Sequence, residues 1–280
     1  MSKIIFMWGM SAVLFLAIVI GVYTLYDKTN ENNNQHAHEV NHESTTKTSH
    51  EHSSSEHDNH SDHNEIGESE VTTNMTYNAN DAMITIDVKD QDGHAPELVL
   101  SHEKRMHLIV VSQDLSHFYH LHPEEKGDGI YNKEFHLPNG AYKVFVDMKP
   151  KQLAYHVNPI ELHVGENHHN HESNNLTPDE TRKKTIDGKK VKLTTTPLQA
   201  GKSVMLTFDT RGHKPEPYLG ALGHVVILDE KGERFLHVHP TSDNQTIFET
   251  TFAQPGTYKI WGEFKFEGNI HTYPFVVEVK

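Results

Sequence analysis

The segment MHLIVVSQDLSHFYHLHP at residues 106–123 recurs as GHVVILDEKGERFLHVHP at residues 223–240. In both copies, an apolar run, a polar turn and a second short run are typical of a β-hairpin. Three histidines recur with one shift of 117 positions (224 − 107, 237 − 120, 239 − 122), and they pair His107, His120 and His122 with His224, His237 and His239. A fourth pair, His156 and His271, recurs with a shift of 115 (271 − 156). The repeat predicts two copies of one β-domain.

The residues around the hairpin repeat as well, so a whole domain is duplicated. Phe118, Phe135 and Pro138 recur as Phe235, Phe252 and Pro255, and Tyr142 recurs as Tyr258 after a one-residue deletion. We therefore expect domains at 71–165 and 186–280, joined by a linker at 166–185.

Short apolar runs separated by turn-forming residues predict strands in both domains. The expected strands are 82–89, 106–112, 118–122, 129–136, 141–148 and 159–164 in the first domain, and 191–195, 203–209, 224–228, 234–239, 246–252, 257–264 and 274–279 in the second. A short helical turn is expected only at 178–184. About seven strands in ~95 residues favour an all-β, immunoglobulin-like sandwich, in which Tyr142 and Tyr258 take the place of the corner tyrosine.

Charge and composition restrict the partners. The 280-residue chain has a formal net charge of −14, which argues against nucleic acid and favours cationic partners. It has no cysteine, which excludes disulfides, thiolate metal sites and a lipid anchor on cysteine.

The first residues predict a membrane anchor. Residues 4–26 carry no charge and are long enough to cross a bilayer core of ~30 Å. No clear signal-peptide cleavage site follows, so we expect a retained single-pass anchor with residues 1–3 in the cytoplasm and the bulk of the chain outside the cell membrane.

Residues 27–70 are mostly polar and predict a disordered tether. It contains eight histidines, which are His36, His38, His42, His50, His52, His57, His60 and His63. The linker adds His168, His169 and His171. Such a segment either acts as a spacer that gains charge in acid or collects transition-metal ions weakly; the density of histidines favours metal collection.

The repeated histidines predict a metal site in each domain. His120 and His122 are two apart on a strand, so they share a face, and a symmetric hairpin would place His107 opposite His122. The same register relates His224 to His239. His156 and His271, just before the last expected strand of each domain, are further candidate ligands. The competing interpretation is that the histidines are strand residues bonded to backbone; their retention in both copies favours ligands.

The remaining histidines and the methionines are weaker candidates. His94 and His213 lie in matched Gly-x-x-Pro loops, whereas His102, His117, His136 and His163 have no counterpart and are expected at the surface. Met106 and Met148 are possible thioether ligands, but Gly223 and Phe264 replace them in the second copy. Imidazole ligands without thiolate suit copper(II), zinc or nickel(II).

A loose family resemblance adds to this interpretation. The tract Pro217–Val226, followed by Phe235–Pro240, resembles a module of bacterial secreted or membrane-anchored proteins, and the two domains more distantly resemble the extracytoplasmic copper-handling domains of the CopC and YtkA-like type. The resemblance implies an immunoglobulin-like fold and a copper role, but it does not assign ligands.

Together these features predict a membrane-anchored extracytoplasmic protein that binds copper(II) or zinc for sequestration, delivery or resistance and that exchanges the ion with a transporter or acceptor protein. One alternative is a cell-surface structural or interaction module with incidental histidines. A cupin-like metalloenzyme is a second alternative, because His120, His122, Glu124 or Glu125 and the Pro138-x-Gly140 turn partly fit the cupin motif, although the second copy lacks the acids. The sequence shows no other catalytic constellation.

Overall fold

The structure, a computed structural model, describes residues 68–165 and 176–280. Within these ranges the chain is all-β and contains no helix, so the helical turn expected at 178–184 is wrong. None of the described residues forms a helix long and apolar enough to cross a membrane. The expected anchor at 4–26 and most of the tether at 27–70 lie outside the described residues, as do the linker histidines.

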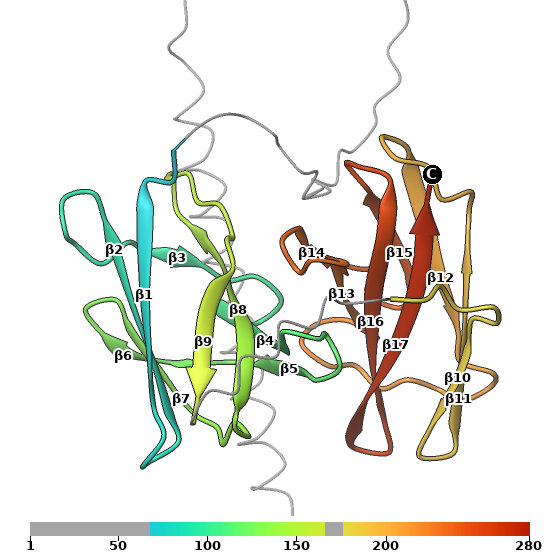
Figure 1. Ribbon diagram of the computed structural model, residues 1–280, viewed down its shortest axis with the longest axis horizontal. Coiled ribbons are helices and arrows are strands. Elements are labelled where there is room, and N and C mark those ends of the chain that lie inside the picture. Colours follow the sequence, from blue (N-terminus) through green and yellow to red (C-terminus); the bar gives the residue numbers. More distant parts are fainter. Residues whose placement is uncertain (1–67, 166–175) are drawn as a thin grey trace, which may run out of the picture. The chain divides into compact units, whose positions relative to one another are not determined.

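The first sandwich consists of two sheets (Figure 1). One sheet has the order β1 (Val71–Asn78), β2 (Met83–Asp90), β7 (Ile130–Glu134) and β6 (Glu124–Gly127). The other has the order β3 (Leu98–Val99), β8 (Gly140–Pro150), β4 (Met106–Ser112) and β5 (Phe118–Leu121), and β9 (Ile160–Val164) also pairs with β8. Sequence patterns did not indicate β1, β3 or β6.

The second sandwich also consists of two sheets (Figure 1). One sheet has the order β10 (Lys183–Ile186), β11 (Lys189–Thr195), β12 (Ser203–Asp209) and β15 (Ile247–Thr251). The other has the order β14 (Phe235–Val238), β13 (His224–Asp229), β16 (Gly256–Phe266) and β17 (Asn269–Val279). Strand β10 was not expected and begins inside the predicted linker, and β17 begins five residues before the expected strand (274 − 269).

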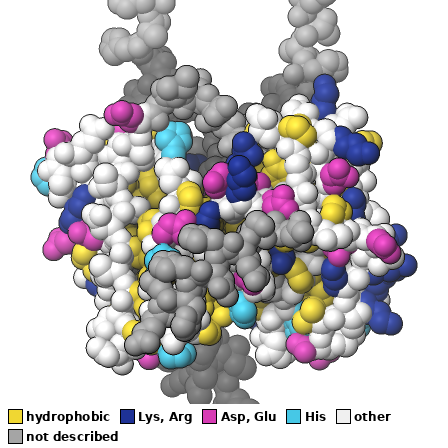
Figure 2. Space-filling view, viewed as in Figure 1, with side chains coloured by type: hydrophobic (Ala, Val, Ile, Leu, Met, Phe, Trp, Pro, Cys, Tyr) yellow, Lys and Arg dark blue, Asp and Glu magenta, His cyan; other side chains and the backbone are white. Residues whose placement is uncertain are grey.

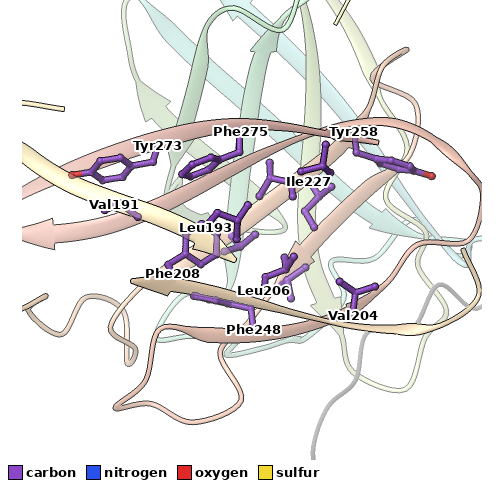
Figure 3. Packing of buried hydrophobic residues seen from close by; sticks show 14 of the residues in the cluster. Val191, Leu193, Val204, Leu206, Phe208, Ile227, Phe248, Tyr258, Tyr273 and Phe275 are labelled. Atoms are coloured by element: carbon purple, nitrogen blue, oxygen red, sulfur yellow. The ribbon is translucent and has the colours of Figure 1, made fainter. Parts of the chain in front are cut away.

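Each sandwich has its own apolar core between its sheets. In the second sandwich, Leu206, Phe208 and Phe248 from one sheet pack against residues of the other, among them Ile227 and Phe275 (Figure 3). On the face shown in Figure 2, acidic and basic side chains are interspersed among hydrophobic and other side chains. Among the described residues, the exposed large hydrophobic side chains are Val99, Leu100 and Ile270.

The corner tyrosines confirm the immunoglobulin-like prediction. Tyr142 Oη donates a hydrogen bond to the Pro138 carbonyl oxygen at 2.8 Å, and Tyr258 Oη donates to the Gln254 carbonyl oxygen, also at 2.8 Å. Both bonds return to the backbone four residues upstream, which is the expected role of a tyrosine at this corner.

The two methionines that were considered as possible ligands pack in the core of the first sandwich. Met106 and Met148 are paired on β4 and β8 and are buried in the core of the first sandwich. Side chains alternate along a strand, so Met106 points away from the face that carries His107. In the second copy, Phe264 fills this space, and a Cβ atom on Gly223 would lie only 2.5 Å from its ring. These positions serve packing, and they do not supply thioether ligands.

Candidate metal centre

The predicted hairpin register is confirmed in both sandwiches. Leu108 pairs with Leu121 and Ile109 with His120, so continuing this register places His107 opposite His122. In the second sandwich Val225 pairs with Val238 and Val226 with His237, and the same continuation places His224 opposite His239. Opposed residues share a face of a sheet. Each repeat therefore presents three histidines on one face, and we call all six the histidine cluster.

That face is covered by the other sandwich and is not open to solvent. Strand β13 is buried at all six positions, and β4 is buried at all but its last. Leu108 and Val110 on β4 belong to the first core, whereas Ile109 and Val111 pack in a third cluster with residues of the second sandwich. The members of this joint apolar cluster are Ile109, Val111, Leu115, Phe145, Val226, Leu228 and Trp261, with Phe118, Val157, Leu176 and Phe235 packed against it. The two sandwiches belong to one compact unit of the chain.

Equivalent aromatic residues make equivalent contacts across this junction. Phe118 stacks on Trp261 with ring centroids 5.0 Å apart, and Phe235 stacks on Phe145 with centroids 4.9 Å apart. Phe118 and Phe235 are repeat equivalents, and so are Phe145 and Trp261 (261 − 145 gives the shift of 116 that also relates the corner tyrosines). The contact is thus nearly isologous, with the same patch used on both sides.

Two carboxylates connect the histidine cluster across the same junction. His120 Nδ1 lies 2.6 Å from Glu263 Oε2, and His237 Nδ1 lies 2.6 Å from Asp147 Oδ2. Asp147 and Glu263 are also repeat equivalents, with the shift of 116 (263 − 147). Each sandwich therefore supplies a carboxylate to a histidine of the other. The side chains are largely buried, with His120 1% exposed and Glu263 7% exposed.

These contacts, together with two backbone contacts, determine which ring nitrogen is protonated. His107 Nε2 lies 3.0 Å from the Ser101 carbonyl oxygen, and His224 Nε2 lies 2.9 Å from the Tyr218 carbonyl oxygen. A carbonyl or a carboxylate oxygen accepts hydrogen bonds, so the facing ring nitrogen carries the hydrogen. In the neutral rings the other nitrogen is then a bare lone pair. These lone pairs are His107 Nδ1, His120 Nε2, His224 Nδ1 and His237 Nε2.

The lone pairs lie close together and are poorly satisfied by the protein. His107 Nδ1 and His120 Nε2 are only 3.0 Å apart, although neither donates when both rings are neutral. His122 Nε2, His224 Nδ1 and His237 Nε2 are buried without any hydrogen-bond partner. Buried polar atoms normally have hydrogen-bond partners, so this concentration of unpartnered ring nitrogens is unusual.

Ligand atoms of the cluster fall into two groups that overlap. In the first group, atoms of His107, His120 and His237 all lie within 4.8 Å of one another. In the second group, atoms of His224, His237 and His239 do so. We expected a separate site in each repeat; instead, the first group combines both repeats and His237 belongs to both groups. The reason is that the histidine face of each sandwich is also its docking face.

Burial keeps the imidazoles of His107, His122, His224 and His237 neutral at ordinary pH. Burial and, after it, the neighbouring His120 ring lower the pKa of His107 to about 4. Burial likewise lowers the pKa of His224 to about 3 and that of His122 to about 2. The pKa of His237 lies well below its ordinary value, first because of burial and then because of nearby histidines. Metal ions bind neutral imidazole, so these rings are in the binding form at neutral pH.

One residue beside the cluster was expected at the surface. His102 stacks on His239 with ring centroids 3.6 Å apart, and its ring also lies edge-on to His224 at 5.7 Å. It lies in the loop before β4, and the equivalent position holds Leu219 (102 + 117), so the repeat gave no signal for it. The prediction that His102 lies at the surface is wrong, because the residue is half-buried and its ring contacts the cluster.

The structure does not bring His156 and His271 into either group of histidines. His156 lies in the loop before β9, as expected, and its backbone nitrogen donates to Ser69 Oγ. His271 lies inside β17, not before it, and its Nδ1 lies 3.0 Å from the Asn269 carbonyl oxygen. Its Nε2 lies 3.7 Å from Asp187 Oδ2. His271 therefore belongs to a separate environment at the start of β17.

The cupin-like ligand set is not formed. Glu124 and Glu125 lie on the exposed strand β6, and their side chains pair with Lys126 and Arg105. The Pro138-x-Gly140 turn accepts the hydrogen bond of the corner tyrosine. In the described residues, the two sheets of each sandwich are also separate and do not close into a cupin-like barrel. No carboxylate of the cupin motif therefore reaches the histidine cluster.

Comparison with protein families identifies the repeated unit. The family model described as "Domain of unknown function (DUF8832)" matches residues 64–166 and again residues 184–280. The chain belongs to this family. Each sandwich is one copy of the family's domain, which agrees with the internal repeat. No curated protein matches the chain.

Several solved structures are similar to the chain at low sequence identity. A segment of two fibronectin type III domains from chicken tenascin is 9% identical, with 74% of this chain and 98% of that chain covered and a TM-score of 0.24. The Escherichia coli adhesin FdeC is 14% identical, with 76% and 64% covered and a TM-score of 0.23. A Salmonella alpha-2-macroglobulin is 15% identical; 75% of this chain aligns with only 15% of it, at a TM-score of 0.25. Scores this low carry no argument about function, and the fold assignment rests on the sheets described above.

Proposed function

We propose that the histidine cluster binds a divalent transition-metal ion, copper(II) or zinc, and that this is the function of the paired sandwiches. The observation that carries the proposal is the orientation of four rings, His107, His120, His224 and His237. In each of them one nitrogen is hydrogen-bonded to a carbonyl or carboxylate oxygen, and the other is directed among the remaining histidines. Metal-binding histidines commonly have this second contact, which orients the ring and raises its basicity.

The spacing of the rings supports copper(II) over zinc. Two nitrogens 3.0 Å apart, as in His107 and His120, would subtend roughly 91–97° at an ion that lies ~2.0–2.1 Å from each. That angle suits adjacent ligands of a tetragonal site, which copper(II) prefers, whereas a tetrahedral zinc site would separate them by about 3.3–3.4 Å. Copper(II) is also the strongest binder in the divalent series.

The rest of the chain supports a role outside the cytoplasm. The apolar segment 4–26 would anchor the protein as a single-pass membrane protein, and the tether histidines between residues 36 and 63 would collect ions weakly near the sandwiches. In this proposal the protein sequesters copper or delivers it to a transporter or acceptor protein, in line with its loose resemblance to copper-handling domains. It is a binding protein and not an enzyme.

Metal analysis tests the proposal directly. The full chain, purified in detergent without an affinity tag of histidines, would carry asparagine at every histidine of the tether and linker so that only the sandwiches bind tightly. We expect at least one copper(II) ion to stay bound against a competing chelator. A variant with His107→Ala and His237→Ala should bind none, whereas His271→Ala, a buried histidine outside both groups, should bind as before. Absence of tight binding in the parent would refute the proposal and leave the interaction-module alternative.

A further inference from the structure

We infer that the two overlapping groups form one shared site for a single copper-class ion, which links the sandwiches through His237 as the common ligand. This inference rests on the proposed function and specifies its stoichiometry. The sequence alone predicts two ions, one for each repeat. The overlap of the groups at His237 is the first observation against two ions.

His237 has only one nitrogen to offer. Its Nδ1 is 2.6 Å from Asp147 Oδ2, so Nδ1 carries the hydrogen and only Nε2 has a free lone pair. That nitrogen is buried without a hydrogen-bond partner. One neutral imidazole nitrogen coordinates one ion, so the groups that share it cannot both be complete at once. They are alternative positions for the same ion.

The buried charge also matches a single ion. The carboxylates that contact the cluster, Asp147 and Glu263, carry two negative charges in their ionised forms, and each contacts a ring of the other sandwich. One divalent cation balances these charges. A second divalent cation within the same cluster would leave two positive charges uncompensated among buried side chains, and uncompensated buried charge is strongly unfavourable.

The shared site explains why both repeats keep the carboxylate. Asp147 orients His237, which is the common ligand, and Glu263 orients His120, which belongs to the first group. Each carboxylate comes from the sandwich that does not contain its histidine. Asp147 and Glu263 are thus positioning residues, and the first group, which takes ligands from both repeats, is complete only when the sandwiches are docked.

Ion counting in the full chain distinguishes one shared site from two independent sites. The protein carries asparagine at the tether and linker histidines, is loaded with excess copper(II) and is dialysed against a chelating buffer. We expect one ion per chain. His107→Ala disrupts only the first group and His239→Ala only the second, so each variant should retain one ion with lower affinity. His237→Ala should retain none, and His271→Ala should match the parent.

The outcomes separate failure of the inference from failure of the proposed function. Two tightly bound ions in the parent, or complete loss of the ion in His107→Ala with retention in His237→Ala, would overturn the shared site while copper binding stands. No bound ion in the parent would overturn both. Because His237→Ala also alters packing, Asp147→Asn provides a second variant that keeps the ring. It should weaken binding about 10- to 100-fold, and unchanged affinity would refute the positioning role of Asp147.

Discussion

Acid should destabilise the metal-free protein through the buried histidines of the cluster. His107 and His224 have folded-state pKa values of about 4 and about 3, whereas imidazoles of the unfolded chain titrate near the ordinary value of 6.5. The pKa is lower in the folded state, so the unfolded state binds more protons below pH 6.5 and stability falls as the pH falls. The loss begins near pH 6.5 and continues until each folded-state pKa is reached.

The magnitude follows from the size of the pKa shifts. Each pH unit below 6.5 removes about 1.4 kcal/mol for each group that stays neutral in the folded state. At pH 5 both His107 and His224 remain neutral when folded, so together they cost about 4 kcal/mol relative to pH 7.5. A loss of this size is a large part of the roughly 5–15 kcal/mol that stabilises a typical domain. Asp147, Glu263 and His102 also face these rings. They are the same residues in the parent and in the variants compared below, so their effects cancel in the comparison.

Denaturant unfolding of the metal-free chain at pH 7.5, 6 and 5 measures this loss. A variant with His107→Gln and His224→Gln cannot titrate at these positions, so its stability should fall by about 4 kcal/mol less than that of the parent. The control is His94→Gln, which removes a histidine whose side chain is 79% exposed and should behave as the parent does. Parallel loss of stability in the parent and the double variant would show that acid acts elsewhere, and the reasoning from buried imidazoles would be wrong.

Four further measurements check other parts of the structure. Trp261→Ala should cost about 3–5 kcal/mol, because Trp261 is buried in the joint apolar cluster, and calorimetry of the variant would measure the cost. Tyr142→Phe should cost about 1–2 kcal/mol by leaving the Pro138 carbonyl without its bond; an unchanged unfolding midpoint would contradict the corner assignment. Gly223→Ala should destabilise by about 1–3 kcal/mol, because its Cβ would meet the Phe264 ring, and normal stability would show that β13 and β16 can separate. Copper affinity of the folded protein should change little between pH 7 and pH 5, because His107, His122 and His224 have pKa values of about 4, 2 and 3 and stay neutral there; a titration that shows a steep loss of affinity between these pH values would point to ligands with ordinary pKa values and exclude these imidazoles.

The fold was largely predictable because its strands carry strong local signals. The apolar runs around Ile109 and Val226, each followed by a turn and a second short run, indicate the central hairpins. The corner tyrosines indicate the type of sandwich. Edge strands were missed for different reasons. Strand β6 consists of exposed residues, three of them charged. Strand β1 does alternate in burial, but its threonines and asparagines conceal the pattern. Pairing at an edge depends on a neighbouring strand more than on local composition.

The histidine cluster was predicted in its register but not in its surroundings. Hairpin symmetry placed His107 opposite His122, which is a local property of one chain segment. Docking of the sandwiches depends on contacts between distant segments of the chain, but one feature of the sequence did indicate it. The run His224–Leu228 is apolar at every position after the histidine, which is typical of a strand buried on both faces. The matched carboxylates, Asp147 and Glu263, were a second signal that the repeat alignment contained.

The retention of histidines in both repeats follows from the geometry of docking. When two copies of one surface pack nearly isologously, each copy must carry both members of every contacting pair. His120 needs the carboxylate of the second sandwich, and His237 needs that of the first. Loss of His120 or His237 would remove a 2.6 Å contact from the facing carboxylate, and loss of a hydrogen bond to a largely buried carboxylate is costly. This exchange of contacts accounts for the presence of His120 in the first repeat and of His237 in the second.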